Sequence, residues 1–260
     1  MRFMNIAARL CFAALLLSIA IGMIAGFGTR FRLWDYQIGL LRIFPLCLYA
    51  GVVAVGLGLA WMLTAVLSGS GAGARYAVIG LLGSIAVLCV PLHDLYLERI
   101  AHAVPPIHDI STDTEHAPAF VTLSGRRPGA TNGPGYDGPT RVEFEGRSYT
   151  TETLQKLFYG DIKSDSLLGI TPAKLFHRAV AAAQAMGWKV VAITPDTEGG
   201  RIEATDTTLL FGLTDDIVIR VRPAGIGARV DVRSKSRVGV NDEGRNAARI
   251  RAYLKQLART

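Results

Sequence analysis

The chain has 260 residues, half of them hydrophobic, and a formal net charge of +7 at pH 7. This length allows one or two domains. The cysteines Cys11, Cys47 and Cys89 all lie in the apolar first part of the chain, which excludes a disulfide framework or a thiolate zinc site in the remainder.

Apolar residues form long uncharged runs up to about Leu97, whereas charged residues are frequent from Ala101 onward. Residues 1–98 are therefore predicted to be a membrane domain. It contains three segments close to the roughly 20 apolar residues needed to span a bilayer, at about residues 10–28, 43–67 and 76–92. Close helix packing is indicated by small residues within the later two segments, namely Gly51, Gly56, Gly58, Gly80 and Gly83.

The first segment has an alternative interpretation as a cleaved signal peptide, with Arg2 and Arg9 as its basic region. Its length and the lack of a cleavage site of the A-x-A type favour an uncleaved helix. Three spans would place the two termini on opposite sides of the membrane. The arginines that flank the spans are almost evenly divided between the two sides of the membrane. Their distribution slightly disfavours a C-terminus outside the cytoplasm.

Residues 99–148 are polar and contain the glycine- and proline-rich run SGRRPGATNGPGYDGPT. They predict an extended connector that wraps the surface of the following domain or links it to the membrane. Imidazoles and carboxylates that could bind a metal ion occur here, at His102, His108, Asp109, Asp113 and His116. Their spacing matches no standard site, so neither a metal site nor a cofactor is predicted.

Residues 149–260 are predicted to form the soluble domain. A helix with an apolar stripe is predicted here, with Thr171 as its N-cap, Pro172 at its first position and Gly187 at its end. After Gly187 the apolar residues recur at every second position. This alternation predicts four strands in antiparallel hairpins, in the segments WKVVAITP, GRIEATD, DDIVIRVRP and ARVDVRSKSRV. A final helix is predicted from about Asp242.

The expected fold class is thus an α+β soluble domain, of helix, four-stranded antiparallel sheet and helix, preceded by three transmembrane helices. Both helices are expected to cover one face of the sheet. The residues expected to face them are Ile202, Ala204, Ile217, Ile219, Val221, Val230 and Val232.

Basic residues alternate along the last two predicted strands, on the side opposite to this apolar face. Guanidinium groups bind phosphate or carboxylate in a bidentate manner, so a candidate contact surface for an anion or a partner consists of Arg220, Arg222, Arg233 and Arg237. The alternative is that this face is exposed to solvent and that its arginines form cross-strand ion pairs with Glu203 and Asp231. Exposed ion pairs of this kind do not by themselves indicate a function.

The segment TDTTLLFGLTDD contains Asp206, Asp215 and Asp216, which could act as paired carboxylates in acid–base chemistry. The favoured interpretation is a connection between strands in which Leu210 and Phe211 plug the core. The sequence has no nucleophile motif, phosphate-binding glycine loop or Ser/His/Asp signature, and no catalytic residue is predicted.

Several blocks resemble the domain of unknown function 1499 family in the right order: PPIHDISTDTEHAPAF, GRIEATDTTLLFGLTDDIVIRVR and ARVDVRSKSRVGVNDEGRNAARIRAYLKQL. The block YGDIK is also similar, with Gly160 where the family usually has proline. The resemblance implies a bacterial or plastid-related protein of no established activity. Some relatives look like lipoproteins, which implies an extracytoplasmic domain. We give this implication more weight than the distribution of the arginines that flank the spans.

The predicted function is a non-enzymatic structural or binding module of the cell envelope, held in the bacterial inner membrane by several spans with its C-terminal domain in the periplasm. The alternative is an enzyme that acts on an envelope lipid or glycan through the Asp/Arg-rich face. Expected partners are the lipid bilayer, with anionic headgroups or an acidic envelope partner. Nucleic acid is not expected, because no binding motif accompanies the basic C-terminal region.

Overall fold

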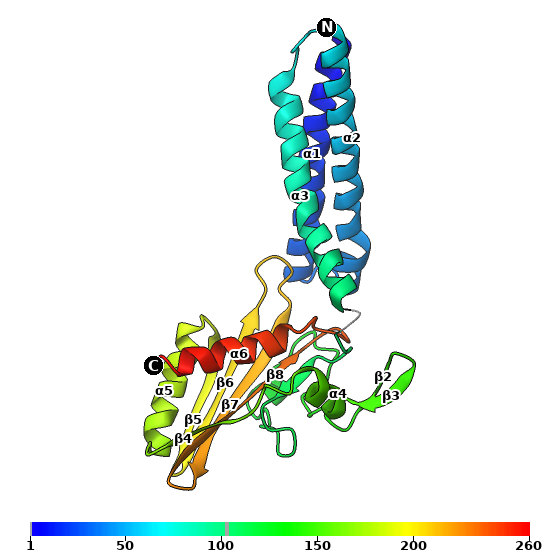
Figure 1. Cartoon of the computed structure of the whole chain (residues 1–260). Helices are drawn as coiled ribbons and strands as arrows, with labels where there is room; N and C mark the ends of the chain where they lie inside the picture. Colours follow the sequence, from blue (N-terminus) through cyan, green and yellow to red (C-terminus); the bar gives the residue numbers. More distant parts are fainter. Residues whose placement is uncertain (1, 102–103) are drawn as a thin grey trace. The chain divides into compact units, whose positions relative to one another are not determined.

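The computed structural model describes residues 2–101 and 104–260 and divides the chain into two compact units (Figure 1). The first unit comprises Met1–Arg99 with the loop Thr208–Leu213. The second comprises Ile100–Thr207 and Thr214–Thr260. The residues expected to form a connector, 99–148, thus belong almost entirely to the second unit.

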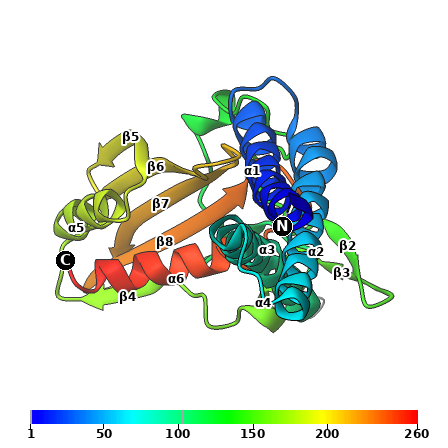
Figure 2. The same cartoon turned by 90° about the horizontal axis from the view of Figure 1, so that it is seen from above.

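The first unit is a bundle of helices α1 (Arg2–Arg30), α2 (Phe44–Ser68) and α3 (Ala74–Ala101), seen end-on in Figure 2. A π-helical segment, η1 (Gln37–Ile43), leads directly into α2. Two continuous helical stretches are long and apolar enough to cross a membrane, Asn5–Arg30 and Gln37–Ser68.

Two of the three predicted segments are therefore helices with the length and apolarity of a membrane span. The third segment, expected at residues 76–92, lies in α3. Its described apolar stretch, Ala74–Cys89, is shorter than a membrane span requires.

Small residues bring the three helices close together. A Cβ atom on Gly58 would lie 3.0 Å from the Leu81 Cβ, and one on Gly80 would lie 2.6 Å from the Cys11 Sγ. Gly51 and Gly83 also face a neighbouring helix, whereas a Cβ on Gly56 would meet nothing within 4 Å. Four of the five glycines expected at helix contacts are thus located there.

The second unit is built on a six-stranded antiparallel sheet with the order β1-β8-β7-β6-β5. A further strand, β4 (Asp165–Leu168), pairs with β8 next to β1. The other strands are β1 (Asp109–Ser111), β5 (Lys189–Asp196), β6 (Gly199–Thr207), β7 (Thr214–Ala224) and β8 (Gly227–Ser236).

The four long strands are those predicted from the alternating pattern, and the prediction of a four-stranded sheet missed β1 and β4. These two strands have only three and four residues. Segments this short carry too little alternation to be distinguished from loops.

Helices α5 (Pro172–Ala185) and α6 (Arg245–Leu257) pack on one face of this sheet (Figure 1). The Thr171 side chain accepts a hydrogen bond from the Lys174 N–H, as an N-cap should. All residues expected on this face are at most 2% exposed: Ile202, Ala204, Ile217, Ile219, Val221, Val230 and Val232. The prediction of two helices on one face is confirmed.

Residues 104–164 supply the remaining structure of the second unit. They include the hairpin β2 (Arg141–Phe144) and β3 (Arg147–Thr150), the short helix η2 (Leu123–Gly125) and helix α4 (Thr151–Phe158). Gln155 of α4 is hydrogen-bonded to both the N–H and the carbonyl of Ser111 in β1. Residues 109–111 and α4 are thus attached to the sheet of the second unit.

Leu210 and Phe211 do not belong to the core of this domain, contrary to the prediction that they plug it. They lie in the loop that joins β6 to β7, beyond the last paired residues Thr207 and Thr214. Residues outside the ladder do not share the pleat that directs alternate side chains to the helix-covered face.

Candidate functional site

The second face of the sheet carries mainly charged side chains from β6, β7 and β8, together with the buried Val218. Because successive side chains point to opposite faces, this face receives Glu203, Asp216, Arg220, Arg222 and the odd-numbered residues of β8 from Arg229 to Lys235. Residues 109–140 cover most of this face, so it is not the solvated face of the alternative interpretation, although the cross-strand ion pairs expected with Asp231 are present.

Arg233 is only 1% exposed, and its partner Asp109 is fully buried. The guanidinium binds both carboxylate oxygens, with Nε 2.8 Å from Oδ1 and Nη2 2.8 Å from Oδ2. It also donates to the carbonyls of Pro118, Pro134 and Gly135 and lies 4.7 Å from the Phe120 ring centre. Each of these partners precedes α4, so Arg233 fastens residues 109–140, which we call the wrapping segment, to β8.

Lys235 continues this buried row. Its Nζ lies 2.7 Å from the Asp137 Oδ2 and donates to the Gly135 carbonyl at 2.6 Å. His108 Nε2 lies 3.1 Å from the same Asp137 oxygen. Burial by itself would raise the pKa of Asp137, but the hydrogen bonds from His108 and Lys235 outweigh it and lower that pKa to about 2.

Arg237, just beyond β8, binds Asp216 through Nε and Nη2 at 2.9 and 2.7 Å. Arg127 of the wrapping segment binds the other carboxylate oxygen of Asp216 at 2.5 Å. Arg237 is 11% exposed, Arg127 is 4% exposed and Asp216 is fully buried. Arg233 and Arg237 are therefore both held inside the structure by carboxylates.

The other two predicted contact residues, Arg220 and Arg222, lie on β7 and converge with Arg229 of β8. We call Arg220, Arg222 and Arg229, with Asp113 and Asp231, the arginine cluster. A single oxygen, the Asp113 Oδ2, accepts hydrogen bonds from Nη2 of all three arginines, at 3.2, 2.9 and 2.8 Å.

Asp231 is the second carboxylate of the arginine cluster and is fully buried. Its Oδ2 lies 2.8 Å from the Arg220 Nη2 and 3.3 Å from the Arg222 Nε, and its Oδ1 is bound by the Arg229 Nε at 2.6 Å. The Ser164 hydroxyl donates to Oδ1 as well. Three cations thus surround two anions, and the cluster keeps one positive charge in excess.

The three arginines remain partly open to solvent, with side chains 26%, 38% and 30% exposed for Arg220, Arg222 and Arg229. Burial alone would raise the pKa of Asp113. The His116 N–H and the three guanidiniums oppose it and hold that pKa below its ordinary value. Asp113 is therefore an anion at neutral pH.

Arg229 is the cluster residue that the predicted contact surface omitted. It is the direct cross-strand partner of Arg222, so pairing the two strands around the turn PAGIG would have identified it. Asp113 lies more than 100 residues away in sequence from the arginines, and no signal in the sequence connects it with them.

Asp206 and Asp215 face each other across β6 and β7 on the helix-covered side of the sheet. Both bind Arg249 of α6, with Nη2 2.9 Å from the Asp206 Oδ2 and 2.6 Å from the Asp215 Oδ2. Arg220 and Arg233 project from the opposite face. Asp206 and Asp215 therefore do not share a face with Arg220 and Arg233, as the alternative of an enzyme with an Asp/Arg-rich face would require.

The carboxylates of the candidate metal group are occupied by cations. Asp109 binds Arg233, and Asp113 binds the arginines of the arginine cluster. The backbone N–H of His116 donates a hydrogen bond to the Asp113 Oδ1. His102 lies outside the described residues. Within residues 2–101 and 104–260 no group of three or more His, Cys, Asp or Glu side chains is placed to hold a metal ion.

A search of the curated proteins finds none that matches this chain. One family model does match, that of the protein of unknown function DUF1499, over residues 109–257. The match covers more than half of the chain and includes every strand of the six-stranded sheet. It begins at Asp109, the buried partner of Arg233, so the wrapping segment lies within the matched region. The chain belongs to the DUF1499 family.

Proposed function

We propose that this chain is a membrane-anchored binding module of the bacterial cell envelope that recognises anionic groups through its arginine cluster. Two helical stretches long and apolar enough to cross a membrane support the anchor. The coordination of three guanidiniums to one Asp113 oxygen supports the binding role and is the observation that carries it.

Cross-strand arginines repel each other unless an anion lies between them. Asp113 and Asp231 bind the three guanidiniums and are at most 7% exposed, whereas the three arginine side chains stay partly exposed to solvent. Since Arg forms planar bidentate pairs with phosphate and carboxylate, the remaining N–H groups suit a phosphate or carboxylate on a partner. The net positive charge of the cluster favours approach of such a partner.

An enzyme acting on an envelope lipid or glycan is the competing proposal. It requires titratable groups that meet at a pocket. Asp206 and Asp215 instead bind Arg249, on the other face from the arginine cluster. No observation favours the enzyme, so we retain the binding module.

The inner-membrane location with a periplasmic domain rests on the lipoprotein-like relatives that the family resemblance implies. A reporter fused after Thr260 tests it. We expect activity from a reporter that works only in the periplasm and silence from one that works only in the cytoplasm. The reverse pattern would place the domain on the cytoplasmic side.

The binding role is tested with the full chain held in nanodiscs of neutral phosphatidylcholine. We expect these discs to capture vesicles that contain phosphatidylglycerol and not vesicles of phosphatidylcholine alone. Arg222→Gln removes the most exposed arginine of the cluster and balances its charge. The affinity should fall about fivefold, since a basic residue near an anionic surface contributes about 1 kcal/mol.

Arg251→Gln is the matched control, because it removes a guanidinium that is 44% exposed and paired with Asp161 on the surface. This variant should bind as the wild type does. Equal capture by the wild type and Arg222→Gln, with both chains folded by circular dichroism, would contradict a role for the arginine cluster.

A further inference from the structure

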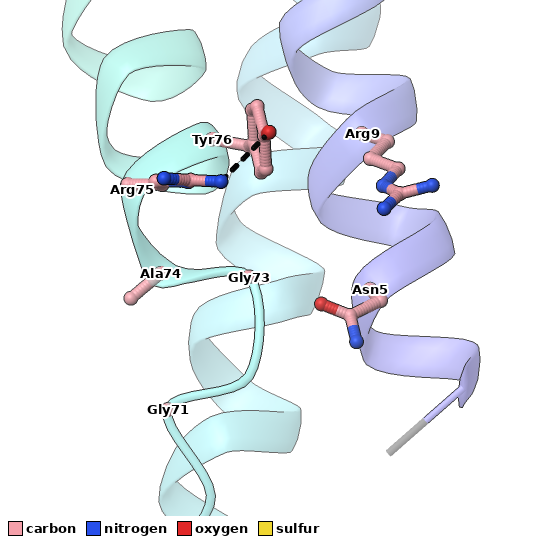
Figure 3. Close-up of a pocket in the computed structure, with 7 residues that line it drawn as sticks. All are labelled: Asn5, Arg9, Gly71, Gly73, Ala74, Arg75 and Tyr76. Atoms are coloured by element: carbon pink, nitrogen blue, oxygen red, sulfur yellow. Dashed lines mark hydrogen bonds between the residues drawn. The ribbon is translucent and has the colours of Figure 1, made fainter.

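A cavity of about 390 Å³ opens at one end of the helix bundle, between the start of α1 and the loop that joins α2 to α3 (Figure 3). The residues around it that matter here are polar, basic or small: Asn5, Arg9, Gly71, Gly73, Arg75 and Tyr76. None of its described lining residues is acidic. The cavity is therefore a basic one, unlike the paired charges of the sheet.

The loop that forms one wall is held against α1. Gly73 has φ +81°, a conformation that suits glycine, and a Cβ on it would lie 2.8 Å from the Ala8 Cβ and 3.0 Å from the Asn5 Oδ1. Trp61 of α2 donates its Nε1–H to the Ala72 carbonyl at 2.9 Å. These contacts fix the loop before any ligand enters.

The donors of the cavity come from two helices. Asn5 and Arg9 are four residues apart on α1 and so share one face of that helix. Arg75 and Tyr76 belong to the first turn of α3, where Arg75 Nη2 donates to the Tyr76 hydroxyl at 3.1 Å and its Cζ lies 4.8 Å from the ring centre. Tyr76 orients the Arg75 guanidinium, and no described carboxylate forms an ion pair with Arg9 or Arg75.

The position of the cavity along the helices indicates its surroundings. One candidate span begins at Asn5 and the other ends at Ser68, directly before the loop. If these stretches cross the bilayer, which is the anchor proposed above, the cavity lies at the depth of the lipid headgroups. Basic pockets between helix ends at this depth suit anionic headgroups.

We propose that this cavity binds the phosphate of an anionic phospholipid, with Arg9 and Arg75 as the charged donors. Asn5 and the Tyr76 hydroxyl are the neutral groups within the cavity that can hydrogen-bond to the headgroup. The inference rests on the proposed anchor and adds a specific lipid site to it. It is separate from the arginine cluster, which lies in the second unit.

The test measures phosphatidylglycerol bound to the full chain in neutral detergent by native mass spectrometry, with phosphatidylcholine and inorganic phosphate as comparison probes. The wild type should retain phosphatidylglycerol in preference to phosphatidylcholine. Arg9→Gln and Arg75→Gln should each lower its affinity about fivefold, and Arg75→Lys should restore part of the loss. Inorganic phosphate should not displace the lipid at equal concentration.

Arg42→Gln is the matched control, because Arg42 is exposed and lies in η1, at the opposite end of α2 from the cavity. It should leave the bound lipid unchanged. Equal losses in Arg42→Gln and Arg9→Gln, or displacement by inorganic phosphate, would overturn the headgroup site. Lipid that stays bound in Arg9→Gln and Arg75→Gln but is lost in Arg222→Gln would move the site to the arginine cluster.

Carbonate extraction of membranes separates this inference from the proposed anchor. A chain that alkali removes from the membrane would refute the anchor. A chain that resists extraction but binds both lipids equally would refute the headgroup site alone.

Discussion

Arg233 illustrates how one side chain can be basic and yet structural. It is as buried as the isoleucines on the other face of the sheet, and every contact it makes fastens residues 109–136 to β8. Removing a charged guanidinium from water is costly unless it has an oppositely charged partner and its remaining N–H groups have hydrogen-bond acceptors. Asp109 and three carbonyls meet that requirement.

Arg233→Ala should destabilise the second unit by about 3–5 kcal/mol, because it leaves the buried Asp109 with incomplete compensation. Urea midpoints of the full chain in neutral detergent, followed by circular dichroism, measure this loss. Arg251→Ala, which breaks the exposed pair with Asp161, should cost only about 0–1 kcal/mol. Similar midpoints for the two variants would contradict the structural role of Arg233.

At the scale of elements, the short strand β4 depends on a very close approach to β8. Leu168 of β4 pairs with Gly227 of β8, and a Cβ on Gly227 would overlap the Leu167 carbonyl oxygen. A backbone carbonyl in a ladder cannot rotate away as the end of a side chain can. Gly227 is therefore required by packing between strands and not by its own dihedral angles.

Gly227→Ala should separate β4 from β8 and cost about 1–3 kcal/mol, as overpacking does. Hydrogen exchange should become faster at Asp165–Leu168 and remain slow in β6. Gly133→Ala is the control, since a Cβ there would meet nothing within 4 Å. Unchanged exchange in β4 would show that the strands tolerate the methyl group.

At the scale of the whole second unit, the wrapping segment and the sheet are joined by charges that titrate in acid. Asp137 lies in the wrapping segment and Lys235 in β8. Because the folded state lowers the Asp137 pKa, its contribution to stability is present above the ordinary carboxyl pKa of 3.8 and is lost as pH falls toward about 2.

Asp137→Asn should remove about 1–2 kcal/mol of stability at pH 7, allowing for screening at a carboxylate that is 27% exposed. The difference from the wild type should shrink between about pH 4 and pH 2, where Asp137 becomes protonated. Urea midpoints across this range give the curve. Asp242, whose pKa burial raises, is common to both chains and cancels in the difference.

The alternating pattern of β5–β8 and the helical periods of α5 and α6 were sufficient to predict the apolar half of the domain. Seven inward residues, the N-cap Thr171 and the coverage of one face by two helices followed from period and capping alone. Local backbone geometry determines which side chains share a face, and so the sequence encodes this part directly.

The charged half was decided only by tertiary structure. An arginine that will be buried and one that will be solvated occur in the same alternating pattern, and what distinguishes them is the segment that folds over them. Asp109 lies 124 residues from Arg233, in a stretch without apolar periodicity. Sequence alone therefore determined the alternation of charge on β7 and β8, whereas long-range ion pairing decided that Arg233 and Arg237 are enclosed and that Arg220, Arg222 and Arg229 stay open to solvent.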